Sequence, residues 1–77
     1  MKKIIIYSTP ACPYCKMAKA YFQKQNIAYT DYDVSAEADK AKEMVKKSGQ
    51  MGVPVIDVGG KIIIGFEQKQ IEEALKA

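Results

Sequence analysis

The sequence contains no histidine, tryptophan or arginine, and only two of its 77 residues are cysteine. The lack of histidine removes the most common general base and the most common metal ligand. The lack of arginine removes the side chain best suited to bidentate contacts with phosphates and bases. The cations are lysines spread along the chain, and the net charge is only +3. We therefore expect neither a nucleic-acid partner nor a metal ion.

Long apolar runs are also missing from the sequence. Runs such as Ile4-Ile5-Ile6 are far shorter than the roughly 20 residues that a membrane helix needs. Lys2 and Lys3 precede this run as in a signal peptide, but the apolar segment is too short for one. A chain of 77 residues, 48% apolar and 27% charged, is typical of a globular protein. We expect a single domain over 1–77, monomeric, cytoplasmic and without membrane contact.

The hydrophobic pattern predicts seven elements in the order β-α-β-α-β-β-α. The predicted strands cover 3–8, 27–34, 53–58 and 61–64, and the predicted helices cover 13–25, 35–47 and 67–76. A strand, a helix and a second strand imply parallel pairing through a right-handed crossover. Gly59-Gly60 favours an antiparallel hairpin between the last two strands. The expected fold class is α/β, with a four-stranded mixed sheet flanked by three helices.

Individual residues mark the expected ends of the helices. Pro13 suits the first position of a helix, where its missing N–H costs nothing. Asn26 is a plausible stop for that helix. Ser35 is expected to cap the second helix, and Gly49 to end it. The buried side of the second helix is expected to consist of Ala38, Ala41 and Val45.

Cys12-Pro13-Tyr14-Cys15 lies between a predicted strand and a predicted helix, a context in which C-x-x-C is typical of a redox motif. Residues three apart on a helix share a face, within the reach of a disulfide. At the start of the helix, free backbone N–H groups and the dipole favour the thiolate of Cys12. Cys15, one turn further and more buried, can then attack a mixed disulfide at Cys12. The sequence predicts Cys12 as the nucleophile and Cys15 as the resolving thiol.

Other uses of the two cysteines remain open. A structural disulfide closing so short a loop would contribute only about 2 kcal/mol, and cytosolic chains seldom keep one. A zinc half-site, or an iron–sulfur cluster bridging two chains, would need ligands from another chain. A non-enzymatic redox carrier or sensor is a third alternative.

Three markers follow one another along the chain: Ile4–Tyr7 leading into Cys12-Pro13-Tyr14-Cys15, Val53-Pro54, and Gly65 before the last helix. In these markers the chain resembles a glutaredoxin over essentially its whole length, which implies a thioredoxin-like fold. The resemblance implies that Pro54 is cis and faces the disulfide. It also implies that the backbone of Val53 pairs with glutathione or a peptide as an added strand.

Two positions differ from the glutaredoxins that use glutathione. Those proteins usually carry a lysine three residues before the first cysteine, where it holds a glutathione carboxylate, and Thr9 stands there in this sequence. Gly65-Phe66 is closer to the glutaredoxin-like redoxins that thioredoxin reductase reduces and that serve ribonucleotide reductase. The start of the last helix, Gln50 and Lys47 remain candidates for holding a carboxylate.

The resemblance thus implies an electron donor in cell redox homeostasis. Its substrates would be disulfide-containing proteins or glutathione, and its reductant would be thioredoxin reductase or the glutathione system. No cofactor is expected beyond glutathione as a co-substrate. The expected substrate-binding residues are Thr9, Pro13, Tyr14, Gln50, Val53, Pro54, Gly65 and Phe66.

The remaining aromatic and basic residues are expected to be structural. The aromatics expected in the core are Tyr7, Tyr21 and Phe22. Tyr14, between the cysteines, is expected to line the substrate groove. Lys46-Lys47 is expected to be a solvated helix end, and solvent screening makes Lys16 a minor influence on Cys15.

Overall fold

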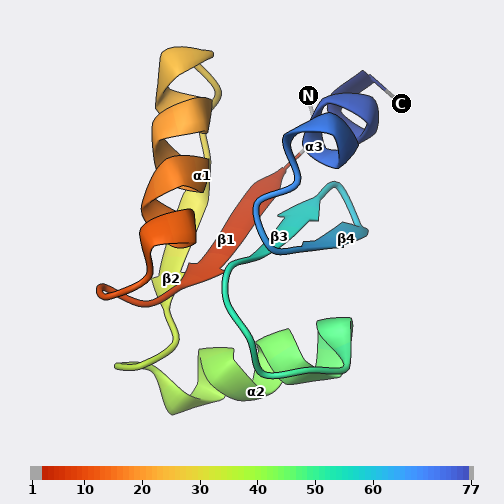
Figure 1. The fold of residues 1–77 in the computed structure, drawn as a ribbon. Coiled ribbons are helices and arrows are strands. Elements are labelled where there is room, and N and C mark those ends of the chain that lie inside the picture. Colours follow the sequence, from red (N-terminus) through yellow and green to blue (C-terminus); the bar gives the residue numbers. More distant parts are fainter. Residues whose placement is uncertain (1–2, 77) are drawn as a thin grey trace.

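A computed structural model describes residues 3–76, which form three helices and one four-stranded sheet (Figure 1). The strands are β1 (Ile4–Ser8), β2 (Thr30–Asp33), β3 (Val55–Val58) and β4 (Lys61–Ile64), and the helices are α1 (Pro13–Lys24), α2 (Ala38–Ser48) and α3 (Gln68–Lys76). The predicted order of elements is confirmed. No helix within the described residues is long and apolar enough to cross a membrane.

The strands lie in the order β2-β1-β3-β4. β1 pairs with β2 in parallel and with β3 in antiparallel, and β3 pairs with β4 in antiparallel. Gly59 and Gly60 connect β3 to β4 with φ angles of 58° and 102°, which the two-residue turn of a hairpin requires. The mixed sheet, the parallel crossover and the hairpin therefore agree with the expectation from sequence.

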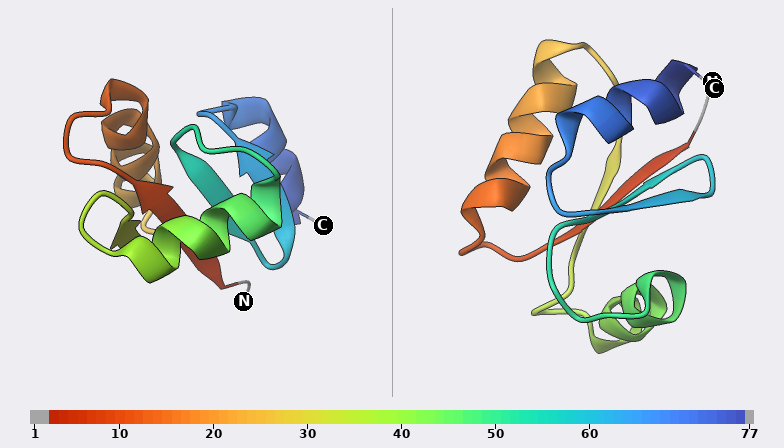
Figure 2. Two further views of the ribbon diagram at one scale, coloured as in Figure 1. Left: turned by 90° about the horizontal axis from the view of Figure 1, so that it is seen from below. Right: turned by 45° about the vertical axis from the view of Figure 1, so that its right-hand side comes forward.

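Helices cover both faces of the sheet, with α1 and α3 on one face and α2 on the other (Figure 2, right). The buried cluster under α1 and α3 consists of Ile4, Ile6, Ala18, Phe22, Ile56, Val58, Ile63, Ile71 and Ala74. The cluster under α2 consists of Tyr7, Met44 and Val55. Successive residues of β1 alternate between the two clusters because strand side chains alternate between the faces. Both faces are apolar, which explains why β1 lacks polar alternation.

The predicted start of the second helix is wrong. α2 begins at Ala38, and Glu37 is its N-cap residue without a side-chain capping bond. Ser35 instead donates its hydroxyl to Asp33 Oδ1 at 2.5 Å, and its backbone N–H donates to the same oxygen at 2.9 Å. The Asp33 side chain thus closes a turn that uses Ser35 before the helix begins.

Burial on α2 also differs from the prediction. Ala38 is exposed and Met44, which the apolar pattern did not single out, is the buried residue of this helix. Lys47 is not a free solvated end, because its Nζ lies 3.0 Å from Asp57 Oδ2. Gly49 ends the helix as predicted, with a φ of 75°.

Two strands start two or more residues later than predicted. Residues 27–29 precede β2, because the Ile27 N–H donates to the Phe22 carbonyl at 2.9 Å and holds the chain against the end of α1. Asn26 adopts a φ of 57° at this stop. β3 begins at Val55 rather than Val53, and the Val53-Pro54 bond before it is cis.

Candidate active site

The two cysteines lie at the N-terminus of α1, next to the end of β1. Cys12 is the N-cap residue, and Pro13 occupies the first turn as predicted. The backbone N–H of Cys15 donates to Cys12 Sγ at 3.1 Å. A hydrogen bond from a helix N-terminus to a sulfur favours its anionic form. The fold thus places the partly exposed Cys12 sulfur against the backbone N–H groups of a helix N-terminus.

Cys15 has a different environment. Its side chain is fully buried, and burial, with a smaller effect of the hydrogen bond to Cys12, raises the pKa of its thiol to about 12. A contact with the Thr9 backbone and the positive charge of Lys19 act in the opposite direction on this pKa. Both cysteines are free thiols, and at neutral pH Cys15 holds its proton.

The Val53-Pro54 segment lies against Cys12 although it is distant in sequence. The carbonyl oxygen of Val53 is 3.9 Å from Cys12 Sγ, and the Val53-Pro54 peptide bond is cis, as the resemblance implied. The Gly65 N–H donates to the Pro54 carbonyl at 2.8 Å, with Gly65 at a φ of 81°. This bond ties the loop before α3 to the loop before β3.

A groove of about 270 Å³ joins these segments beside the cysteines. Its lining consists of Tyr14, Val53, Pro54, Gly65, Phe66 and Glu67. Five of these were predicted from sequence as substrate-binding residues. Glu67 was missed, because an exposed carboxylate ahead of a helix carries no signal beyond that of a helix start. Tyr14 is 61% exposed and lines the groove, whereas the buried residues of α1 are Cys15, Ala18 and Phe22.

Three other predicted residues do not line this groove. Thr9 accepts the Cys12 N–H on its backbone oxygen at 3.3 Å and so shapes the turn before α1. Pro13 opens α1 and is exposed. Gln50 accepts the Gly52 N–H at 2.6 Å and donates to the Gly52 carbonyl at 2.9 Å. Gln50 therefore shapes the loop that leads to Val53.

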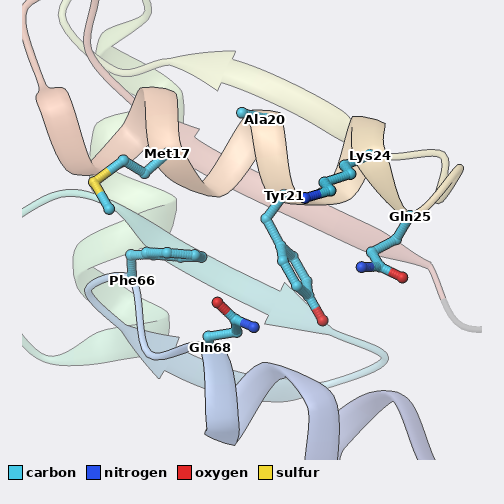
Figure 3. Close-up of a pocket in the computed structure, with 7 residues that line it drawn as sticks. All are labelled: Met17, Ala20, Tyr21, Lys24, Gln25, Phe66 and Gln68. Carbon is cyan, nitrogen blue, oxygen red and sulfur yellow. The ribbon is translucent and has the colours of Figure 1, made fainter.

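Phe66 extends the apolar surface beyond the groove. A second hollow of about 340 Å³ lies between α1 and the start of α3, and Phe66 lines it as well. Figure 3 shows Phe66 and Gln68 facing Met17 and Tyr21 across this hollow. The Phe66 and Tyr21 ring centroids are 6.0 Å apart. Phe66 is therefore shared by two adjoining depressions, of which the first lies beside Cys12.

A polar cluster that the sequence did not predict lies on the α1 side of the sheet. The Ser8 hydroxyl donates to Asp31 Oδ1 at 2.6 Å, and Lys19 Nζ lies 2.9 Å from Asp31 Oδ2. Ser8 is buried. The hydrogen bond to Asp31 raises the pKa of Lys19, and the ionised form of Cys15 would raise it further.

A second polar cluster lies under α2. Tyr7 donates its hydroxyl to Glu43, and Lys47 Nζ donates to Tyr7 Oη at 2.9 Å and to Asp57 Oδ2 at 3.0 Å. The bond from Tyr7 holds the pKa of Glu43 below its ordinary value. Lys47 is thereby engaged away from the groove, so its suggested contact with a substrate carboxylate is not supported.

Comparisons with known proteins agree with this geometry. The family model described as Glutaredoxin matches residues 4–63. The chain is 42% identical over 73 residues to a glutaredoxin-like 8.6 kDa protein in the rubredoxin operon of Clostridium pasteurianum, covering 95% of this chain and 97% of that protein. The chain belongs to the glutaredoxin family.

Glutaredoxin 3 of Escherichia coli K12 is 34% identical over 67 residues, covering 87% of this chain and 81% of that protein. Among solved structures, a mutant of the thioredoxin-like protein BC3987 superimposes with a TM-score of 0.91 at 28% identity. The match covers 99% of this chain and 97% of that one. The fold is therefore thioredoxin-like. Glutaredoxins work with disulfide substrates and reductase systems, so the family suggests thiol–disulfide oxidoreductase activity for this chain.

Proposed function

We propose that this glutaredoxin is a dithiol–disulfide oxidoreductase in which Cys12 attacks the substrate and Cys15 resolves the mixed disulfide. The asymmetry of the two sulfurs carries the proposal. Cys12 is half-exposed and accepts a helix N-terminal N–H at 3.1 Å, whereas Cys15 is fully buried and protonated. Cys12 Sγ is accessible to a substrate, whereas the buried Cys15 Sγ can react only with Cys12 Sγ.

In the proposed reaction, the two cysteines supply the electrons that reduce the substrate disulfide. The Cys12 thiolate attacks one sulfur of a substrate disulfide, forming a Cys12–substrate disulfide and releasing the first substrate thiolate, which takes up a proton. Cys15 then loses its proton and attacks Cys12 Sγ, which forms the Cys12–Cys15 disulfide and releases the second substrate thiolate. Starting from the Cys12 thiolate, the chain gives up two electrons and the proton of Cys15. The second proton taken up by the two substrate thiolates comes from solvent, which received it when Cys12 ionised, and a reductase system restores both thiols.

We propose the groove beside Cys12 as the docking site for the substrate. Val53 offers its backbone next to Cys12, while Tyr14 and Phe66 offer apolar surface. An extended peptide can pair with an exposed backbone segment and place side chains on such surfaces. This arrangement favours protein disulfides over small hydrophilic ones.

We further propose that thioredoxin reductase is a better reductant for this chain than glutathione. The groove lining includes the carboxylate of Glu67 and no cation. Thr9 stands where glutathione-using relatives usually carry a lysine. A glutathione carboxylate would thus meet a like charge and lack a charge-assisted partner. The Gly65-Phe66 pair supports the same assignment, with ribonucleotide reductase as one candidate recipient of the electrons.

The experiment compares two NADPH-coupled assays on the oxidised protein. One contains glutathione with glutathione reductase, and the other contains thioredoxin reductase. We expect insulin disulfides to be reduced in both, with the faster rate in the thioredoxin reductase assay. Equal or faster turnover with glutathione would contradict the assignment of the reductant. Absence of turnover in both assays would contradict the enzyme proposal and favour a non-enzymatic carrier or sensor.

A bridging iron–sulfur cluster is the less favoured alternative. Cys12 and Cys15 are the only cysteines in the sequence, so such a cluster would need ligands from another chain. The match of the chain to glutaredoxins favours disulfide chemistry instead.

A further inference from the structure

Lys19 and Asp31 have no role in the reaction as proposed so far, yet Lys19 acts on its buried thiol and Asp31 forms an ion pair with Lys19. Lys19 follows Cys15 by four residues on α1, and residues so spaced are neighbours on one helix face. Asp31 is on β2, parallel to β1 and paired with Ile6. The cluster thus joins α1 to two strands directly beside the resolving cysteine.

The ammonium group of Lys19 is held in place by residues of the sheet. Asp31 Oδ2 lies 2.9 Å from Lys19 Nζ, while Asp31 Oδ1 accepts the Ser8 hydroxyl at 2.6 Å. Ser8 is buried at the end of β1. Asp31 is therefore fixed by the sheet, and it fixes Lys19 in turn. A lysine tethered in this way keeps its charge near α1 instead of extending into solvent.

We propose that Lys19, tethered by Asp31, is a positioning residue that stabilises the Cys15 thiolate during resolution of the mixed disulfide. This inference rests on the proposed function, because it assigns an aid to one step of that reaction. Lys19 acts through its charge and does not itself attack or leave. Asp31 and Ser8 act through Lys19.

The charges around Cys15 differ between the reduced protein and the mixed disulfide. This difference increases the relative influence of Lys19 on the ionisation of Cys15. Among the described residues, Cys12 and Lys19 are the titratable groups that act on the Cys15 pKa, and Asp31, Cys15 and Tyr29 are those that act on Lys19. In the reduced protein, Cys12 opposes ionisation of Cys15. In the mixed disulfide Cys12 carries no charge, so burial then opposes ionisation and Lys19 favours it. The Cys15 proton leaves to solvent, and the departing substrate thiolate takes one up.

The test follows both steps separately by rapid mixing of the reduced protein with 5,5′-dithiobis(2-nitrobenzoate). The first release of nitrothiobenzoate reports attack by Cys12, and the second reports resolution by Cys15. Lys19→Met removes the charge, and Lys19→Arg keeps it. Lys16→Met is the matched control, because Lys16 is exposed beside Cys15 on the same helix, where solvent screens its charge.

We expect Lys19→Met to shift the pH midpoint of the second phase upward by about one unit. At pH 7 the thiolate fraction falls about tenfold while its nucleophilicity rises about threefold, so the second phase slows about threefold. The rate of the first phase should change by less than about twofold, which is less than the roughly threefold slowing expected for the second phase. Lys19→Arg should restore the midpoint, and thermal melts should show that all variants are folded.

An unchanged midpoint in folded Lys19→Met, or an equal shift in Lys16→Met, would overturn the inference while the proposed function stands. A wild-type protein without a second phase would overturn the proposed function itself. A slower second phase with an unshifted midpoint would mean that Lys19 only packs against α1, and would also overturn the inference.

Discussion

The backbone N–H of Cys15 donates to Cys12 Sγ at 3.1 Å, so the proposed resolving residue is hydrogen-bonded to the sulfur of the proposed nucleophile. The bond uses the main chain of Cys15 and is independent of its side chain. Replacing the Cys15 thiol therefore leaves the hydrogen bond to Cys12 in place. The two cysteines can thus be separated by substitution.

Cys12→Ser is expected to reduce disulfide reductase activity to background, because the only half-exposed thiol is lost. Cys15→Ser should instead accumulate a mixed disulfide between Cys12 and a substrate, since no second thiol can resolve it. Mass spectrometry of each variant after incubation with an oxidised peptide measures this difference. Accumulation of the adduct in Cys12→Ser would contradict the assignment.

The lining of the groove by Phe66 leads to a prediction about substrate class. Phe66→Ala should raise the KM for a peptide disulfide about tenfold, because about 1.5 kcal/mol of apolar contact is lost. The rate with a small hydrophilic disulfide should change little. Phe66→Leu is the matched control, since it keeps an apolar side chain at both hollows. An equal loss with both substrates would mean that Phe66 supports the fold rather than peptide binding.

Thr9→Lys is expected to raise glutathione-coupled activity. A charge-assisted contact contributes roughly 1.5–3 kcal/mol, which corresponds to about a ten- to hundredfold gain in glutathione affinity. Thr9→Gln, which lengthens the side chain without a charge, serves as the control. Activity driven by dithiothreitol should be nearly unchanged in both variants, because the cysteines are untouched. No gain over Thr9→Gln would mean that position 9 does not approach the glutathione carboxylate.

The cluster under α2 predicts a pH-dependent stability. Tyr7 donates to Glu43, which lowers the pKa of that carboxyl. A lowered pKa stabilises the fold above the unfolded value and ceases to do so as pH falls through the folded value. Tyr7→Phe should thus lower Tm at pH 7 by a few degrees, because the hydrogen bond to the ionised Glu43 carboxylate is lost. This difference should shrink below about pH 4.

Tyr29→Phe provides the control for that prediction, because the Tyr29 hydroxyl accepts from Gln23 and contacts no carboxylate in the hydrogen bonds of the described residues. Its Tm difference from the unchanged protein should be small and constant between pH 7 and the acid range. A Tyr7→Phe difference that stays constant over the same range would contradict the role of Glu43.

Local signals explain why the placement of the two cysteines at the start of α1 was predictable from sequence. Cys12 and Cys15 are three residues apart at a strand-to-helix junction, so spacing and context suffice. The order of the elements along the chain and the hairpin also follow from hydrophobic pattern and from Gly59-Gly60. The cis Val53-Pro54 bond was expected only from resemblance to a family, since proline before a strand is ordinary.

Tertiary pairing explains what the sequence did not reveal. Lys19 and Asp31 lie on different elements, and neither a periodic pattern nor a short motif links them. Ser35 has a side chain that can cap a helix, but its hydroxyl and backbone N–H donate to Asp33, two residues earlier, instead. Buried Asp57 lies within an apolar strand and finds its partner, Lys47, only when α2 packs on the sheet.

Selective alkylation tests the central claim most directly. The reduced protein is treated with substoichiometric iodoacetamide at pH 6, and the labelled cysteine is identified by peptide mapping. Because Cys15 is fully buried and its pKa is raised to about 12, we predict that the label is found almost entirely on Cys12. Labelling of Cys15 before Cys12, or of both cysteines equally, would contradict the division of roles between the two thiols.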